Sequence, residues 1–274
     1  MSNLPNKVKD RLVAGLKRFQ PILAAAKSRD VNESDTVIIV TDLLAEMFGF
    51  DKYSEITSEF VVRGTYVDLA IKFDGTIQLL IEVKAIGLDL KDSYIKQAVD
   101  YAANQGVEWV ALTNAETWHV YKVNFSKPIA QELVFEINLL ATNPKDSDQL
   151  STLYMLTKEG LGKAMLDEYH AQRQALSRYF ISAMMITDPV LNVLRRELRQ
   201  LSPDVKVDNE QIRDVITQEI FKREVIEGEK AEEARKKIAR AASRAQRKAA
   251  KEAADDEPEP TSADALPAAP LLNE

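Results

Sequence analysis

Two acidic residues and one lysine have the types and the spacing that phosphodiester hydrolysis would need. Asp68 ends the stretch GTYVD, and Glu82 and Lys84 end the stretch LLIEVK. Such a reaction requires a hard cation held by oxygen ligands, an activated water molecule, and positive charge near the developing oxyanion. Two carboxylates can supply the first requirement, and a lysine beside them can supply much of the rest.

The elements around these residues predict that the three side chains gather. Residues 66–73 and 77–84 have strand composition, and Asp74-Gly75 between them is a strong hairpin signal. Residues two apart in a strand share a face, so Glu82 and Lys84 point the same way. Asp68 lies on the partner strand of this hairpin, where its carboxylate can come near Glu82.

An acid-x-lysine triplet is a weak motif, and the chain contains two others, which begin at Asp89 and Asp204. Asp89 follows a glycine in an expected loop, and Asp204 lies beside a proline in an expected link between helices. Only the triplet beginning at Glu82 ends a buried type of strand behind a hairpin that carries a second acid. A solvent-facing strand with a salt bridge stays an open alternative.

The remaining pattern predicts an α/β fold with a mixed central sheet flanked by helices, then an all-α region and a disordered C-terminal tail. Asn32 can cap a helix that ends near Gly49, and further strands are expected at 109–112, 117–123 and 133–139, after a helix over about 92–104. The expected divisions are an N-terminal helix at 1–28, an α/β domain at 29–142, a helical domain at 147–228, a basic helix at 229–251 and an acidic tail at 252–274.

The composition excludes several classes of protein to which the chain could otherwise belong. The 274 residues include no cysteine, which excludes disulfides and thiolate metal sites. The N-terminus does not lead into a signal-type apolar region, and no apolar run is long enough to span a bilayer, so a cytoplasmic protein without membrane contact is expected.

Charge is divided unevenly along the chain. The net charge is −7, but residues 235–251 hold eight bases and no acid, and residues 252–274 hold seven acids and no base. The acidic body argues against broad electrostatic capture of nucleic acid. Nucleic-acid phosphate and the chain's own acidic tail are both possible counter-surfaces for the basic segment, and a solvated helix without a partner stays open. Its candidate nucleic-acid contacts are Arg235, Lys236, Lys237, Arg240, Arg244, Arg247 and Lys248.

Residues 33–123 resemble the N-terminal nuclease domain of type I restriction enzyme R subunits, within the PD-(D/E)XK superfamily. The resemblance rests on the order of several short stretches. These are NE at 32–33, LL at 43–44, GFD at 49–51, YVDLAI at 66–71, IEVK at 81–84 and QAVDY at 97–101.

By position, the resemblance implies Asp68 and Glu82 as ligands of Mg²⁺ or Mn²⁺ and Lys84 as the group that orients water and stabilises charge. It further implies Gln97 and Tyr101 as an auxiliary pair and Glu33 as a helix acid at the edge of the cluster. Two departures are visible. Val67 stands where the family's name has proline, and Gly162-Lys163 is followed by alanine, so no P-loop motor accompanies the domain.

The sequence therefore favours a metal-dependent endonuclease with DNA as the preferred substrate, in restriction, defence or nucleic-acid processing. The alternative is a non-catalytic module that keeps the fold and binds nucleic acid or a protein, the latter through the helical region. The complete set of Asp68, Glu82 and Lys84 favours the enzyme, whereas the acidic body favours the binding module.

Overall fold

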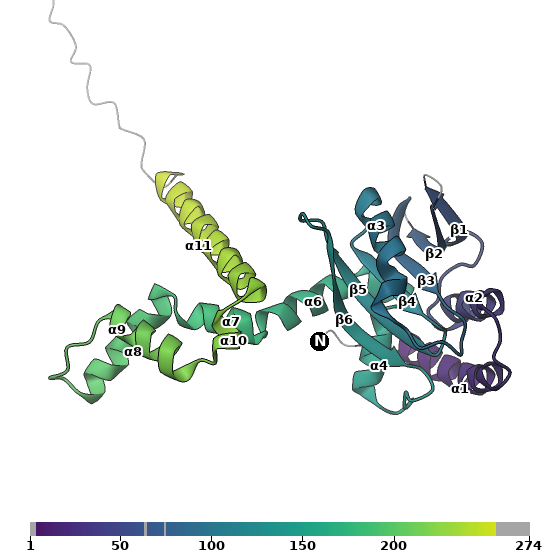
Figure 1. The fold of residues 1–274 in the computed structure, drawn as a ribbon, viewed down its shortest axis with the longest axis horizontal. Coiled ribbons are helices and arrows are strands. Elements are labelled where there is room, and N and C mark those ends of the chain that lie inside the picture. Colours follow the sequence, from purple (N-terminus) through teal and green to yellow (C-terminus); the bar gives the residue numbers. More distant parts are fainter. Residues whose placement is uncertain (1–3, 63–64, 74, 256–274) are drawn as a thin grey trace, which may run out of the picture. The chain divides into compact units, whose positions relative to one another are not determined.

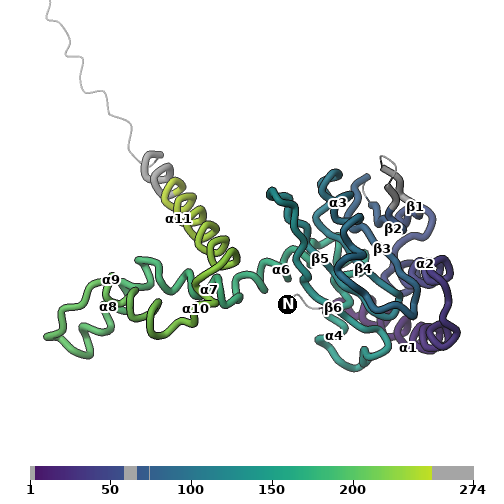
Figure 2. The backbone as a smooth tube through the Cα atoms, viewed as in Figure 1, coloured from purple at the N-terminus to yellow at the C-terminus, as the bar shows by residue number. Residues whose placement is uncertain are grey.

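The computed structural model describes residues 4–62, 65–73 and 75–255, which form two compact units, residues 1–171 and 172–274 (Figure 1). Figure 2 traces the path of the backbone. Asp74 of the predicted turn and residues 256–274 of the predicted tail lie outside the described residues. No helix in the described part of the chain has the length and apolarity needed to cross a membrane.

The first unit is built on one six-stranded sheet in the order β1-β2-β3-β4-β5-β6. Only β3 and β4 are parallel, because the chain crosses from one to the other through a helix, and the other neighbours are antiparallel. The strands are β1 (Ile56–Val62), β2 (Thr65–Phe73), β3 (Thr76–Val83), β4 (Trp109–Thr113), β5 (Thr117–Asn124) and β6 (Ala130–Asn138). The mixed sheet agrees with the sequence prediction.

Helices cover both faces of this sheet. Their bounds are α1 (Asn6–Ser28), α2 (Glu33–Asp42), the π-turn η1 (Leu43–Met47), the 3₁₀ turn η2 (Asp92–Ile95), α3 (Lys96–Gln105), α4 (Ser147–Tyr154) and α5 (Lys158–Gly162). Leu79, Ile81 and Val83 share one core with α1, η1 and α4, whereas Leu80 shares the other core with α3. This division follows from the alternation of side chains along β3.

Local signals in the sequence account for several boundaries. The side chain of Asn32 accepts a hydrogen bond from the N–H of Asp35, which caps α2 as predicted. The helical path that begins there continues through η1 and reaches Gly49, whose φ of +86° lies in the region that glycine adopts most readily. Gly75 also has a positive φ, +76°, in the predicted β2–β3 turn.

The second helical segment begins later than the sequence predicts. The expected boundary was residue 147, yet α4 and α5 belong to the first unit, where Leu150 and Leu153 are fully buried in the core that α1 covers. The helix predicted at 1–28 belongs to the same core through Leu12 and Leu16. One face of the sheet is therefore covered jointly by amphipathic helices that precede the strands in sequence and by others that follow them.

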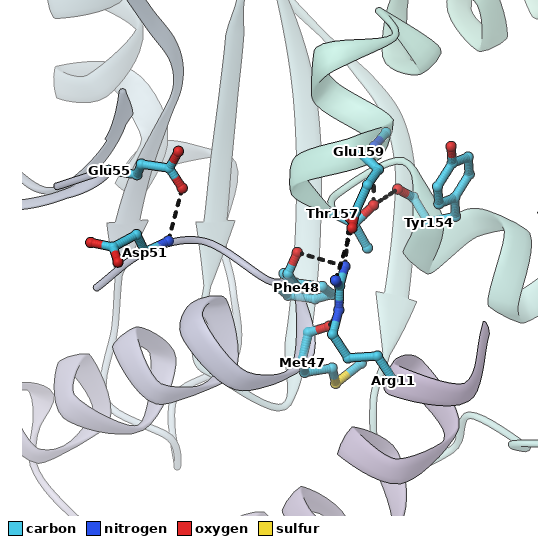
Figure 3. A network of polar contacts seen from close by, with 9 residues as sticks. Arg11, Met47, Phe48, Asp51, Glu55, Tyr154, Thr157 and Glu159 are labelled. Carbon is cyan, nitrogen blue, oxygen red and sulfur yellow. Dashed lines mark hydrogen bonds and ion pairs between the residues drawn. The ribbon is translucent and has the colours of Figure 1, made fainter. Parts of the chain in front are cut away.

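Arg11 connects α1 to two segments of the chain, one that precedes the strands in sequence and one that follows them (Figure 3). Its guanidinium donates to the carbonyl oxygens of Met47 and Phe48 at 3.1 and 3.2 Å and forms a two-pronged ion pair with Glu159 at 2.9 and 2.6 Å. A Cβ on Gly49 would lie 2.5 Å from the Arg11 guanidinium carbon, so a larger residue there would displace the end of the Arg11 side chain. The network joins α1, the end of η1 and α5.

The second unit is entirely helical in its described part. Its elements are the end of α6 (Met165–Ala175), which begins in the first unit, then α7 (Arg178–Met185), α8 (Asp188–Leu201), α9 (Asn209–Val215), the π-turn η3 (Ile216–Ile220), α10 (Arg223–Ile226) and α11 (Glu229–Asp255). α7 contacts α8, α10 and α11, and a small core of Leu191, Ile212 and Ile216 joins α8 to α9 and η3. α11 continues to Asp255, so the first residues of the predicted tail, 252–255, are helical.

Candidate active site

Asp68 and Glu82 come from adjacent antiparallel strands. Leu69 of β2 pairs with Ile81 of β3, and the two acids are each one residue beyond this pair. The main-chain N–H of Val83 donates a hydrogen bond of 2.7 Å to Oδ2 of Asp68. The carboxylate of Asp68 is therefore attached to the strand that carries Glu82, as the hairpin pattern predicts.

Lys84 brings its charge to the same place. Its Nζ lies 2.8 Å from Oε1 of Glu82 and 3.5 Å from Oε1 of Glu33, which opens α2. The main-chain N–H of Lys84 donates to the carbonyl oxygen of Thr113 at 2.8 Å, which fixes the residue against the end of β4. Glu82 is nearly buried, with 9% of its surface exposed, so the ion pair is shielded from solvent on most sides.

This shielding shifts the pKa values of the three side chains. Burial raises the pKa of Asp68 and of Glu82 above their ordinary values, and nearby carboxylates add to the effect. Burial disfavours the ammonium of Lys84, but the hydrogen bond to Glu82 and the surrounding acids outweigh it and raise the pKa of Lys84. The lysine consequently keeps its positive charge at neutral pH.

Thr36 couples the helix that carries Glu33 to the chain just after Lys84. Its side chain is fully buried, and Oγ1 accepts a hydrogen bond of 3.2 Å from the N–H of Ile86. The same hydroxyl donates to the carbonyl oxygen of Asn32 at 2.8 Å. No sequence motif points to Thr36, although its position one turn after Glu33, on the inner side of a capped helix, is a usable signal.

Asn114, which follows β4, holds the loop after β3 from the other side. Its Nδ2 donates to the carbonyl oxygens of Leu88 and Ile86 at 2.9 and 3.4 Å, and its Oδ1 accepts from the N–H of Thr117 at 2.7 Å. The sequence pattern places this residue only between two expected strands, at 109–112 and 117–123. The loop that leaves Lys84 is thus secured by two buried polar side chains from separate elements.

Gln97 and Tyr101 lie one turn apart on α3, the helix that packs against β2 and β3. Tyr101 is buried in the core between α3 and the sheet, and burial raises the pKa of its hydroxyl. Gln97 is exposed in the first turn. Glu82 points to the same sheet face as Leu80, and α3, which carries Gln97 and Tyr101, covers that face.

The competing triplets do not lie on strands. Asp89 is exposed in the loop between β3 and η2, and Asp204 is exposed in the link between α8 and α9. His119 lies in the same transverse row as Glu82, through the pairs Glu82–Leu112 and Leu112–His119, but two strands away. Its Nε2 lies 3.4 Å from Oε2 of Glu136, on the side away from the acids of β2 and β3.

The donor set suits a hard cation, because Asp68 and Glu82 offer carboxylate oxygens and Mg²⁺ is commonly bound through one or two carboxylates. Within residues 4–62, 65–73 and 75–255, no group of three or more histidine, aspartate or glutamate side chains is placed to hold a metal ion. Water or substrate oxygens would have to complete the coordination of an ion held by these two acids.

The seven basic residues predicted to contact nucleic acid all lie on α11 in the second unit. They belong to the other unit from Asp68, Glu82 and Lys84.

The first unit therefore has a mixed sheet in which an acid within β2 lies beside an acid and a lysine at the end of β3, an arrangement typical of a nuclease-like α/β domain. Residues 40–135, which are 96 of the 274, match the family model described as the type I restriction enzyme R protein N terminus. The match includes Asp68, Glu82, Lys84, Gln97 and Tyr101, and it excludes Glu33. The chain resembles that domain over this stretch. Searches of curated proteins and of solved structures gave no match.

Proposed function

We propose that the first unit is a metal-dependent nuclease that hydrolyses phosphodiester bonds, with DNA as its substrate. The observation that carries the proposal is the gathering of Asp68, Glu82 and Lys84 on the adjacent strands β2 and β3, with Lys84 Nζ 2.8 Å from Glu82 and Asp68 hydrogen-bonded to Val83. The match to the N-terminal domain of restriction enzyme R proteins supports a nuclease-like role.

In this proposal Asp68 and Glu82 hold a Mg²⁺ or Mn²⁺ ion. When bound, such an ion would act as a Lewis acid toward the phosphate and would lower the pKa of a water molecule. Lys84 places a positive charge beside the carboxylates, where it can orient the attacking water and stabilise the charge that develops on the phosphate oxygens. Glu33, 3.5 Å from Lys84 Nζ, positions the lysine from the side of α2.

Gln97 and Tyr101 have a supporting role in the proposal. They lie on the helix that covers this face of the sheet, and Gln97 is exposed where a substrate could reach it. Its amide can donate and accept hydrogen bonds, so it is suited to a phosphate or a base edge. Tyr101 is buried and supports the packing of α3.

The test is cleavage of supercoiled plasmid and of linear duplex DNA by the full chain, with Mg²⁺, with Mn²⁺ and with EDTA. Wild-type protein should cut with either metal and not with EDTA. Glu82→Gln should lose cleavage while its circular dichroism stays unchanged, and Asp204→Asn, a change of equal charge in the second unit, should retain it. Equal cleavage by folded Glu82→Gln protein would reject this site.

A non-catalytic binding module is the second candidate, and the acidic charge of the body favours it because most of the surface would repel DNA. In that case no metal would support cleavage of plasmid, single-stranded DNA or RNA. Binding of a partner would nevertheless survive Glu82→Gln, so the two candidates give opposite results in the same set of measurements.

A further inference from the structure

The basic residues of α11 form a stripe along one side of the helix. At about 100° per residue, the angular positions of Lys236, Lys237, Arg240, Arg244, Arg247 and Lys248 fall within about 120° of one another. Arg235 falls outside this arc. A charge run that merely solubilised the helix would not need this one-sided arrangement.

The opposite side of α11 packs on the rest of its unit. Ala231 and Ala234 are buried and Ile238 is half-buried, and α7 is the main contact of the helix. Every side chain from Ala239 to Lys248 is exposed, because the helix extends beyond α7 (Figure 1). The stripe therefore faces solvent on a helix that is anchored only at its start.

Within the part of the chain that the structure describes, local partners engage lysines of the stripe but not its three arginines. Lys236 lies 3.8 Å from Glu232, and Lys237 donates to Gln174 at 2.8 Å. The guanidinium groups of Arg240, Arg244 and Arg247 form no hydrogen bond or ion pair with any other residue that the structure describes. These three arginines lie at successive turns and line one shallow depression on the helix.

A row of arginines at successive turns is complementary to an extended anion, and the residues on the opposite side of the helix distinguish a membrane surface from a nucleic acid. An amphipathic helix that lies in a membrane needs large apolar residues opposite its charges, whereas residues 239–250 offer only alanine, serine and glutamine there. Arginine is well suited to paired hydrogen bonds with phosphate. The major groove of B-DNA is about 12 Å wide and admits a helix of about 10–12 Å diameter.

We propose that α11 is a duplex-DNA-binding helix that contacts backbone phosphates through Arg240, Arg244 and Arg247, with Lys236, Lys237 and Lys248 beside them. The site is distinct from the acids of the first unit. It binds without regard to base sequence, since its contacts are charges rather than a base-reading set. The inference does not depend on the proposed hydrolysis, because a binding helix functions equally well in a protein that does not cut.

The experiment measures binding of a fluorescent 24-base-pair duplex to the full chain in EDTA, which removes metal-dependent cleavage, over a series of KCl concentrations. The test variant is Arg240→Gln/Arg244→Gln/Arg247→Gln. The control is Arg195→Gln/Arg196→Gln/Arg199→Gln, which removes the same charge from α8 in the same unit. Glutamine keeps helix propensity in both variants, and circular dichroism checks the helix content.

The test variant should bind at least about tenfold more weakly at low salt, and the slope of log K against log[KCl] should fall by about three because three phosphate contacts are lost. The control should stay within about twofold of wild type. Equal weakening of both variants would show an effect of net charge and overturn the proposal. Preferential binding of the stripe to vesicles of phosphatidylserine and phosphatidylcholine, or an unchanged salt slope, would also overturn it.

Discussion

The N–H of Val83 donates a 2.7 Å hydrogen bond to Oδ2 of Asp68, so an acid on β2 occupies a donor of the neighbouring strand. Beyond the Leu69–Ile81 pair, the side chain of Asp68 takes the place that a main-chain carbonyl would fill in a regular ladder. The acid is thereby held at a defined height relative to Glu82. The contact gives Asp68 a structural role that can be separated from its charge.

Asparagine at position 68 should separate these two roles. Asp68→Asn retains an oxygen that can accept from Val83 but removes the negative charge, whereas Asp68→Ala removes both. We expect Asp68→Asn to lose cleavage by about 100-fold or more with little loss of stability. Asp68→Ala should lose cleavage equally and also lower the free energy of unfolding by about 1 kcal/mol. Plasmid cleavage and urea unfolding measure the two effects.

The three proposed catalytic residues should act as one unit. Asp68→Ala, Glu82→Ala, Lys84→Ala and the triple variant should then have similar residual activity, since residues that act together have non-additive effects. Single-turnover cleavage rates of the four proteins provide the comparison. Losses that multiplied across the single variants would contradict a shared function.

The other acid-x-lysine triplets should be dispensable. Asp204→Ala and Asp89→Ala remove exposed side chains from loops, so cleavage and metal binding should stay within error of wild type. Cleavage rate and Mn²⁺ titration by calorimetry test this. A tenfold loss of activity in either folded variant would mean that the wrong triplet was assigned.

Thr36 should matter for stability through its hydroxyl. Thr36→Val keeps the shape but leaves the N–H of Ile86 buried without its acceptor, which should cost about 1–3 kcal/mol. Thr36→Ser keeps the hydroxyl and should lose less. Urea denaturation of the two variants measures the difference, and equal stability would show that the contact is not needed.

The ion pair between Arg11 and Glu159 should make stability depend on acid pH. The hydrogen bonds from Arg11 lower the pKa of Glu159 in the folded protein, so this contribution exists above the unfolded value and disappears as pH falls through the folded one. Solvent screens the pair in part, so we expect Glu159→Gln to be less stable by on the order of 1 kcal/mol at pH 7. The difference should shrink between about pH 5 and pH 3, as measured by urea unfolding at each pH.

Local pattern explains why the pairing of Asp68 with Glu82 could be predicted. The hairpin joins residues close in sequence through a two-residue turn, and the alternation along β3 sets the face of Glu82 and Lys84. Thr36 and Asn114 could not be assigned in the same way. Their contacts with Ile86 join residues that are 50 and 28 positions apart in the sequence. Contacts over such sequence separations depend on the packing of the whole unit rather than on any local signal.

Local sequence pattern likewise could not predict how far along the chain the first unit extends. α4 is an ordinary amphipathic helix, and its sequence does not reveal which core its apolar side will join. The prediction assigned it to a separate helical domain, whereas the structure buries Leu150 and Leu153 beside α1.

The return of α4 and α5 to the core sets the smallest piece of the chain that can be prepared alone. The N–H of Lys158 donates to the carbonyl oxygen of Phe48, and Glu159 binds Arg11, so α5 fastens the ends of the unit together (Figure 3). An excised fragment that stopped at residue 142 would lose α4 and α5, expose the part of the core that they share with α1, and should aggregate in expression. A fragment that ended near residue 171 would keep α4 and α5 over this core and should stay monodisperse at high concentration.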